Sequence, residues 1–575
     1  MVFNDERVNT HFDLKIWVCV SDDFSMMKIL ESIIENTIGK NPDLTSLESI
    51  QKKVRDMLIS KRYLLVLDDV WSEDQEKWNK LKSSLQHGKK GASILVTTRL
   101  DIVTSIMGTY RAHPLAQLSD DDIWSLFKQH AFGPNGEARA ELAAIGREIV
   151  RKCVDSPLIA KVLGSSLRFT RDEHQWIFVL ESEIWNLTED NPILSALRLS
   201  YFNLKLSVRP CFTFCAVFPK DFEMEKDHLI QLWMANGLVT SRGNLQMEHV
   251  GNEVWNELYQ RSFFQEVKLD RVGNISFKMH YLVHDLAQSV MGQECVASEA
   301  ESLSNLSSRV HHISCFVTKR KFDYNMIPKK VESLRTFLEF KKSPGISDVL
   351  PSILPLRASR TSSFQLSSLK NLMHLRYLEL SYSHITTLPG SVCRLQKLQT
   401  LKLYSCLFLS SFPKQFRKLQ DLRHLIIKNC PSLISTPFRI GELTCLKILT
   451  IFIVGPKTGY GLAELHNLQL GGKLHIQGLQ NVLNEEYARE ANLIGKKDLN
   501  RLYLSWGDYA NSQVRGVDAK RVLEALEPPH SGLKQFGVNC YGGTDFPHWM
   551  RNTSILKGHL VKTAGSFLHL LNCHV

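Results

Sequence analysis

The sequence predicts a multidomain α/β-plus-α chain that ends in a solenoid. Three observations lead to this fold class: short apolar runs alternate with helix-like stretches up to about residue 115, a helical region follows, and a leucine-containing frame then recurs at a nearly constant period. A length of 575 residues agrees with several domains, because single hydrophobic cores rarely grow beyond about 250–300 residues.

The composition indicates a globular protein with reduced thiols. The chain is 43% hydrophobic and 22% charged, has no apolar run near membrane-span length, and begins without the apolar segment of a secretion signal. Its net charge of +11 is spread along the chain, which favours an ordinary solvated surface over a nucleic-acid stripe. Twelve cysteines without Cys-x-x-Cys spacing favour reduced thiols over a disulfide scaffold or a zinc site. We expect a cytoplasmic location, with peripheral membrane attachment or a nuclear location left open.

The first segment has the pattern of a parallel α/β sheet. Apolar runs at 14–20, 63–70 and 93–98 are separated by amphipathic stretches at 26–38 and 46–58. Strands that alternate with helices at this spacing predict a parallel sheet covered on both faces.

Charged residues follow two of these apolar runs. Asp68 and Asp69 come after four apolar residues, which is the Walker B pattern, and Arg99 follows the third run. Parallel strands end at one edge of the sheet, where open α/β sheets bind ligands. In P-loop proteins the Walker B acid holds the Mg²⁺ that bridges nucleotide phosphates. Two alternatives stay open: a strand-terminating turn for the aspartates, and an ion pair between Arg99 and the carboxylates.

The middle of the chain is predominantly helical. Ser119, followed by three aspartates and an apolar pattern, predicts a helix that begins with a capping box. Cys211 and Cys215 lie four residues apart, so they face one side of a helix, and we expect them in the core rather than on a metal. The apolar segment 229–234 has no arginine or lysine to read base edges, so we expect it to pack inside the protein rather than on DNA.

A repeat dominates the second half of the chain. The frame Leu-x-x-Leu-x-Leu recurs with steps of 23, 24 and 24 residues between its first leucines, and Cys406 and Cys430 fall at the Asn/Cys position of the leucine-rich repeat. Stacked repeats form a solenoid whose concave strand face is available for binding. The frame at the start of each clear repeat is set by Leu375, Leu398, Leu422 and Leu446.

Together, these motifs resemble plant disease-resistance receptors of the nucleotide-binding, leucine-rich-repeat family (NB-ARC/LRR, coiled-coil type). The resemblance begins at 12–21 and extends to about residue 555, and its most specific part is 211–222 followed by 227–237, which is similar to the winged-helix part of these receptors. It implies the following domains: 1–115, a partial P-loop-type α/β nucleotide-binding domain; 116–190, a helical ARC-like subdomain; 191–300, a winged-helix subdomain; 301–345, a linker with the first irregular repeats; 346–557, leucine-rich repeats; and 558–575, an aberrant tail that fits no repeat frame.

The resemblance also implies roles for the residues at the sheet edge. Asp68 would hold Mg²⁺, Asp69 would act on water as the catalytic residue, and Arg99 would sense the terminal phosphate of ADP or ATP.

Further roles carry over to the helical region. Pro157 would lie against the adenine, although Asp155 and Ser156 replace the family's glycine and leucine before it. His280 would touch the diphosphate, and Tyr281 stands where the family has an acid that helps to hold the ADP-bound resting state. A helix-entry proline without a ligand and a solvated histidine remain the alternatives.

The sequence contains no G-x-x-x-x-G-K-[ST] phosphate-binding loop. We therefore expect a chain truncated before or within the P-loop, with impaired nucleotide binding and at most a weak switch-type ATPase activity. Losing several charge-assisted hydrogen bonds of about 1.5–3 kcal/mol each weakens binding by orders of magnitude. The absent N-terminal signalling domain and the irregular tail suggest a shortened product as well.

The family resemblance implies an intracellular immune receptor switched by ADP and ATP. Its partners would be a pathogen effector or a guarded host protein at the repeats, together with other receptor protomers; no specific nucleic acid is expected. The alternative is a binding-only leucine-rich-repeat decoy or regulator of full-length receptors without nucleotide chemistry.

Overall fold

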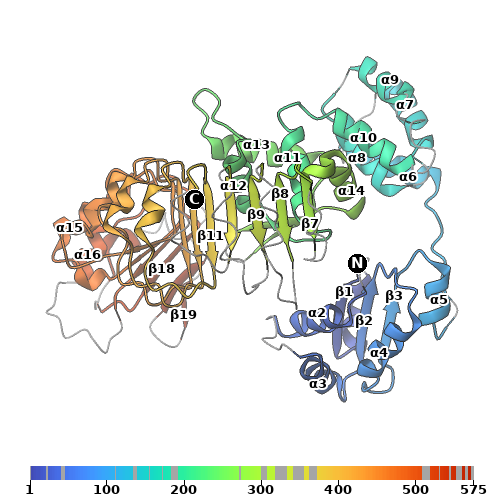
Figure 1. The fold of residues 1–575 in the computed structure, drawn as a ribbon, viewed down its shortest axis with the longest axis horizontal. Coiled ribbons are helices and arrows are strands. Elements are labelled where there is room, and N and C mark those ends of the chain that lie inside the picture. The colour runs from blue at the N-terminus through green and yellow to red at the C-terminus, as the bar shows by residue number, and fades with distance from the viewer. Residues whose placement is uncertain are drawn as a thin grey trace. The chain divides into compact units, whose positions relative to one another are not determined.

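The protein is described by a computed structural model (Figure 1) that divides into two compact units, Met1–Gln117 and Leu118–Val575. The described residues are 2–20, 24–39, 46–110, 112–133, 139–153, 156–170, 172–182, 185, 192–270, 273–298, 307–316, 333–340, 355–361, 372–507, 519–529, 531–542, 546–551, 560–563 and 567–571. Within them, no helix is both long and apolar enough to cross a bilayer.

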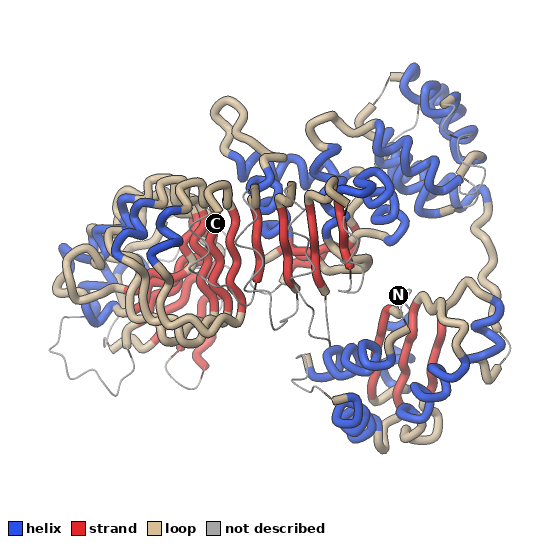
Figure 2. The backbone as a smooth tube through the Cα atoms, in the orientation of Figure 1, coloured by secondary structure: helices blue, strands red, loops and turns tan. Residues whose placement is uncertain are grey.

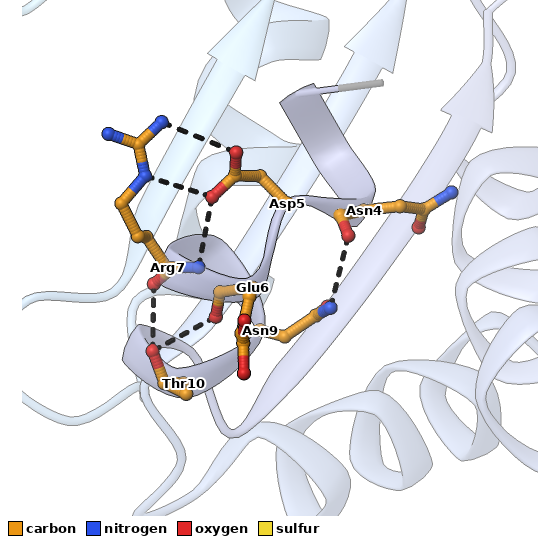
Figure 3. Close-up of polar contacts among 6 residues, drawn as sticks. All are labelled: Asn4, Asp5, Glu6, Arg7, Asn9 and Thr10. Atoms are coloured by element: carbon orange, nitrogen blue, oxygen red, sulfur yellow. Dashed lines mark hydrogen bonds and ion pairs between the residues drawn. The ribbon is translucent and has the colours of Figure 1, made fainter.

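The first unit opens with a short capped helix. The 3-10 helix η1 (Val2–Asn4) is followed by the helix α1 (Glu6–His11), whose N-cap is Asp5. The Asp5 carboxylate accepts hydrogen bonds from the backbone N–H and the Nε of Arg7, each at 3.0 Å (Figure 3). A carboxylate at this position satisfies a backbone donor that the helix leaves unpaired. Asn9 also donates to the Asn4 carbonyl at 3.2 Å, which ties α1 to the preceding turn.

A three-stranded parallel sheet forms the centre of the first unit. Its strands are β1 (Leu14–Cys19), β2 (Tyr63–Asp68) and β3 (Ser93–Val96), in the order β1-β2-β3. The helices around it are α2 (Met26–Ile38), α3 (Leu47–Leu58), α4 (Gln75–Leu85) and α5 (Asp101–Met107). The predicted parallel sheet is confirmed, because each apolar run forms a strand and each amphipathic stretch forms a helix.

The second unit begins with a group of helices. They are α6 (Asp120–Phe132), α7 (Ala140–Arg151), α8 (Pro157–Leu167), α9 (Glu173–Glu181) and α10 (Pro192–Phe202). The hydroxyl of Ser119 accepts from the Asp122 N–H at 3.2 Å and donates to the Asp122 carboxylate at 2.6 Å, so the predicted helix start is confirmed. Fully buried Phe127 and Trp176 pack edge to face in the core of this group.

A small antiparallel sheet and its helices follow. The strands β4 (Met224–Glu225), β6 (Ile275–Lys278) and β5 (Gln265–Leu269) pair in that order. Around them lie α11 (Arg209–Phe214), η3 (Cys215–Val217), α12 (Lys226–Asn236), α13 (Met247–Gln260), α14 (Tyr281–Met291) and η4 (Gly292–Glu294). Cys211 and Cys215 are fully buried, as is most of α12. Both core predictions are therefore confirmed.

The strands of the repeat array follow, and most of them pair parallel (Figure 2). One sheet contains, in order, β14 (Ile448–Leu449), β13 (His424–Lys428), β12 (Thr400–Tyr404), β11 (Tyr377–Ser381), β10 (Ala358–Thr361), β9 (Thr336–Glu339), β8 (His312–Cys315) and β7 (Cys295–Ser298). The other contains β15 (Ile451–Ile453), β16 (Gly472–Gln477), β17 (Leu499–Ser505), β18 (Gln535–Asn539), β20 (Phe567–Leu571) and β19 (Leu560–Thr563). Only β18, β20 and β19 pair antiparallel in this second sheet.

Helical turns connect the strands of the array. They are η10 (Gly390–Arg394), η11 (Lys414–Lys418), η12 (Ile440–Glu442), η13 (Leu462–Leu465), η14 (Leu479–Asn481), α15 (Glu485–Arg489), α16 (Ala519–Ala525) and α17 (His548–Arg551). The repeat leucines align in register, as Leu378, Leu401 and Leu425 do, and are fully buried. The Cys406 thiol donates to the Leu380 carbonyl of the preceding repeat at 3.5 Å, which explains a cysteine at this position without redox chemistry.

Candidate functional site

The carboxyl edge of the first unit's sheet gathers the predicted acids around one hydroxyl. Leu67 and Val96 are in register, so Asp68 at the end of β2 and Thr97 directly after β3 lie at the same edge. The Thr97 hydroxyl donates to Asp68 Oδ1 at 2.5 Å and accepts from the Asp69 N–H at 2.8 Å. Thr97 therefore orients the Asp68 carboxylate and fixes the backbone of Asp69.

Asp69 occupies a left-handed backbone conformation. Its φ is +58°, which short polar residues tolerate better than branched ones. The next residue, Val70, donates its N–H to the Thr97 carbonyl at 2.9 Å, so pairing between the two strand ends continues past Asp69. The turn is thus held in place by the neighbouring strand.

Arg99 lies at the same edge. Its Nε is 3.9 Å from Asp69 Oδ1, and its guanidinium lies over the Trp71 ring at 5.2 Å from the centroid. The Arg99 and Asp69 side chains are 47% and 29% exposed, so the pair contributes little to stability. The structure therefore brings Asp68, Asp69 and Arg99 together, and the turn and the ion pair of the two alternatives are both present.

Pro157 and His280 belong to the second unit. Pro157 is exposed and is the first residue of α8, after the N-cap Ser156; Asp155 lies outside the described residues. His280 is the N-cap of α14, and its Nδ1 accepts from the Leu282 N–H at 3.2 Å. The predicted proline therefore starts a helix and the predicted histidine caps one.

His280 also contacts its neighbour in the chain. The rings of His280 and Tyr281 lie 4.4 Å apart at 32°. The Tyr281 ring thus packs on the His280 imidazole.

The chemistry of the sheet edge suits one end of a magnesium nucleotide. Mg²⁺ is usually held by one or two carboxylates together with substrate phosphates. In the part of the chain that the structure describes, no group of three or more His, Cys, Asp or Glu side chains could hold a metal. Asp68 and Asp69 supply two carboxylates at this edge, and Arg99 supplies positive charge. The 575-residue sequence adds no glycine-rich loop and lysine to this donor set.

Sequence reasoning missed Thr97. The signal was present, because two threonines directly precede Arg99 at the end of an apolar run. A hydroxyl at a strand end can satisfy both a carboxylate and a backbone N–H on the adjacent strand.

A buried ionic junction between the winged-helix segment and the repeats was also missed. Arg423 donates to both carboxylate oxygens of Glu248, at 2.7 and 2.8 Å, and His424 Nε2 lies 3.0 Å from Glu248 Oε1. Burial raises the pKa of Glu248, but hydrogen bonds from His424 and Arg423 outweigh it and hold that pKa well below its ordinary value. The partners are 175 positions apart, so no local pattern announces them.

Three family models match the sequence. They are the NB-ARC domain over residues 1–137, the disease resistance protein winged helix domain over 217–287, and the R13L1/DRL21 LRRs over 462–574.

Similar curated proteins come from plants. RGA4 and disease resistance protein RGA2, both of Solanum bulbocastanum, are 48% and 46% identical over 97% of this chain, which covers 54% and 55% of their own lengths. Disease resistance RPP13-like protein 4 of Arabidopsis thaliana is 29% identical over 100% of this chain and 69% of its own length. The chain thus spans about half the length of the two Solanum proteins.

Proposed function

Because the chain belongs to the plant disease resistance proteins that carry NB-ARC, winged-helix and leucine-rich-repeat segments, we propose that it acts in disease resistance as an intracellular receptor. In this proposal the repeats bind a pathogen effector or a guarded host protein in the cytoplasm. The first unit responds to ADP and ATP, and the response is passed to other receptor protomers.

The observation that carries the nucleotide part is the Thr97 hydroxyl shared by Asp68 and Asp69. We propose that Asp68, held in one orientation, binds Mg²⁺, and that Asp69 orients water as the catalytic residue. Arg99 would balance the charge of the terminal phosphate. A bound magnesium ion would neutralise charge that develops on the phosphates.

Pro157 and His280 are proposed to complete the nucleotide contacts. The exposed ring of Pro157 offers an apolar surface for a base. Because His280 Nδ1 accepts from a backbone N–H, a neutral imidazole carries its proton on Nε2, the atom we propose donates to a diphosphate oxygen.

We propose that the 575-residue chain binds nucleotide weakly and hydrolyses it slowly or not at all. A phosphate-binding loop supplies several charge-assisted hydrogen bonds of about 1.5–3 kcal/mol each, so binding without one is weaker by orders of magnitude. The purified chain should therefore bind ADP with a dissociation constant in the millimolar rather than the micromolar range.

Titration with a fluorescent ADP analogue, with and without Mg²⁺, tests this proposal. Asp68→Asn should abolish the Mg²⁺-dependent part of the affinity and Arg99→Ala should weaken ATP more than ADP. Asp56→Asn and Arg55→Ala, at exposed positions on α3, are matched controls that should behave as the unmodified chain. Micromolar affinity would contradict the proposed impairment, and an Asp68→Asn chain with unchanged Mg²⁺ dependence would contradict the site assignment.

A second candidate function is a binding-only regulator of full-length receptors. It is favoured by a sequence without the glycine-rich phosphate loop. Co-precipitation with a full-length relative should then occur without bound nucleotide and should survive Asp68→Asn. Association that requires added nucleotide would exclude this candidate.

A further inference from the structure

The first half of the strand face of the repeat array is covered by another part of the same chain. On this half, Arg357 donates to the Asn236 carbonyl at 2.8 Å and the Thr336 hydroxyl donates to Asn236 Oδ1 at 2.9 Å. The buried ring of Tyr377 stacks on His228 at 5.8 Å. Helix α12 thus packs on β10 and β11 (Figure 1), and this half of the face is an internal interface.

The second half of the face is formed by β15–β18. Because side chains alternate along a strand, residues in register form rows on one side of the sheet. Among the described residues, the side-chain hydrogen bonds and ring contacts of Lys473, His475 and Arg501 come from within these four strands. The rows are Lys473, Arg501 and Gln535; Ile451, His475 and Tyr503; Ile453 and Gln477; and Ser505 and Asn539.

A hydrogen-bond network fixes the centre of this second half. His475 Nε2 lies 2.7 Å from the Ser505 hydroxyl, and Gln477 Nε2 lies 3.2 Å from His475 Nδ1. The Tyr503 hydroxyl donates to Gln535 Oε1 at 3.0 Å, and the Lys473 ammonium lies over the Tyr503 ring at 5.2 Å from its centroid. A face ordered in this way loses little side-chain entropy when a partner binds.

Positive charge on this face has no compensating acid on its own strands. The sequences of β15, β16, β17 and β18 contain no Asp or Glu. Lys473 and Arg501 are in register on neighbouring strands. Burial lowers the pKa of Lys473, and the charges of Arg501 and Lys428 lower it further. Burial and the Lys473 charge lower the pKa of His475 to about 4, so the imidazole is neutral at neutral pH.

We propose that this basic strand face, defined by Lys473, Arg501, His475, Tyr503 and Gln477, binds an acidic and partly apolar segment of a protein partner. The inference rests on the proposed role of the repeats in binding a partner. Carboxylates would relieve the repulsion between Lys473 and Arg501 and accept hydrogen bonds from them. Half-buried Ile451 and Ile453 beside the polar rows offer contact to apolar side chains of a peptide.

The same features disfavour a nucleic acid. Phosphate-backbone binding relies on many lysine or arginine contacts and on aromatic rings free to stack on bases. Here Lys473, Arg501 and the more distant Lys428 are the cations. The Tyr503 hydroxyl is hydrogen bonded within the sheet, and its ring contacts Lys473 and His475.

Selection from a phage library of random peptides, roughly 12 residues long, tests the proposal on the full 575-residue chain. The face variant combines Lys473→Glu with Arg501→Glu, and a milder variant combines Lys473→Gln with Arg501→Gln. The control variant combines Lys414→Glu with Arg394→Glu, which make the same charge change at exposed positions on η11 and η10. Thermal unfolding should show that all variants fold.

Peptides with several Asp or Glu residues should be enriched about tenfold or more on the unmodified and control chains over the face variant. The milder variant should fall between them, and raised salt should weaken binding. Selection of neutral or basic peptides, equal enrichment on the face variant, or tighter binding of a labelled single-stranded oligonucleotide at the same residues would overturn the proposal. Asp68→Asn should leave peptide binding unchanged, because Asp68 lies in the first unit. A failure of the nucleotide proposal can therefore be distinguished from a failure of the peptide proposal.

Discussion

Glu248→Gln should loosen the attachment of the repeats to the winged-helix segment. The substitution keeps the shape of the side chain but removes the charge that pairs with Arg423 and His424. Arg423 is 14% exposed and His424 is 2% exposed, so the cation would remain largely buried without an anion. The loss should therefore exceed that of a surface ion pair.

The stability that Glu248→Gln should remove lies between two limits. Removing one partner of a fully buried pair costs about 3–5 kcal/mol, and exposed pairs contribute about 0–1 kcal/mol. Because the Glu248 side chain is 23% exposed, we expect a loss of about 2–3 kcal/mol. This corresponds to a roughly 30- to 150-fold larger equilibrium constant for local opening, at 1.36 kcal/mol for each factor of ten.

The effect should depend on pH in a defined direction. The pKa of Glu248 in the folded chain is held below its ordinary value of 4.5. Its contribution to stability is therefore fully present above about pH 4.5 and is lost as the pH falls from there toward the folded pKa. The difference between the unmodified and Glu248→Gln chains should shrink below pH 4.5.

Native-state hydrogen exchange at β13 measures this opening. The His424 N–H donates to the Gln399 carbonyl at 2.9 Å and should exchange faster in Glu248→Gln by the factor given. Glu253→Gln, on the same helix but in the exposed pair with Arg242, is the matched control and should change exchange by less than about threefold. Equal effects of the two substitutions, or no change at β13, would refute the reasoning.

Three further predictions concern single side chains. Thr97→Val removes the two hydrogen bonds of the Thr97 hydroxyl, so it should lower the hydrogen-exchange protection of the β2 and β3 amides by about 1 kcal/mol. Ser93→Ala, at the exposed start of β3, should leave this protection unchanged. Burial lowers the pKa of Lys496 from 10.5 to about 8, so the unfolded chain binds more protons than the folded chain between these two pH values. The free energy of unfolding, measured in urea, should therefore rise from pH 8 to 10.5, and the rise should be smaller in Lys496→Met. Leu401→Ala should lower stability by about 2–5 kcal/mol, while Leu407→Ala, at a 46% exposed position of the same repeat, should have little effect.

Local patterns were sufficient to predict most of the fold. Each apolar run of the first segment became a strand, and the leucine period placed buried residues such as Leu401 and Leu425 in register. These features depend on residues close in the sequence, whose alternation or period decides which side is buried. The edge acids followed from the same reasoning, since parallel strands end together.

Features that depend on register between distant segments could not be predicted in this way. The Thr97 hydroxyl reaches Asp68 only because two strands pair with a particular alignment. At Thr450 the array divides into two sheets, and its hydroxyl both accepts from the Ile427 N–H and donates to the Ile427 carbonyl. The strand β20, in the segment that we expected to fit no repeat frame, pairs antiparallel with β18.

Charge pairing distinguishes the two halves of the strand face. On the half that contacts the winged-helix segment, Arg360 lies 3.1 Å from Glu379, and Arg423 is bound by Glu248 from α13. Each of these two cations is matched by an acid from the chain itself. On the basic strand face, Lys473 and Arg501 adjoin each other with no acid on their strands. Since an uncompensated pair of cations is stabilised by an external anion, Lys473 and Arg501 favour the second half of the array for an acidic partner.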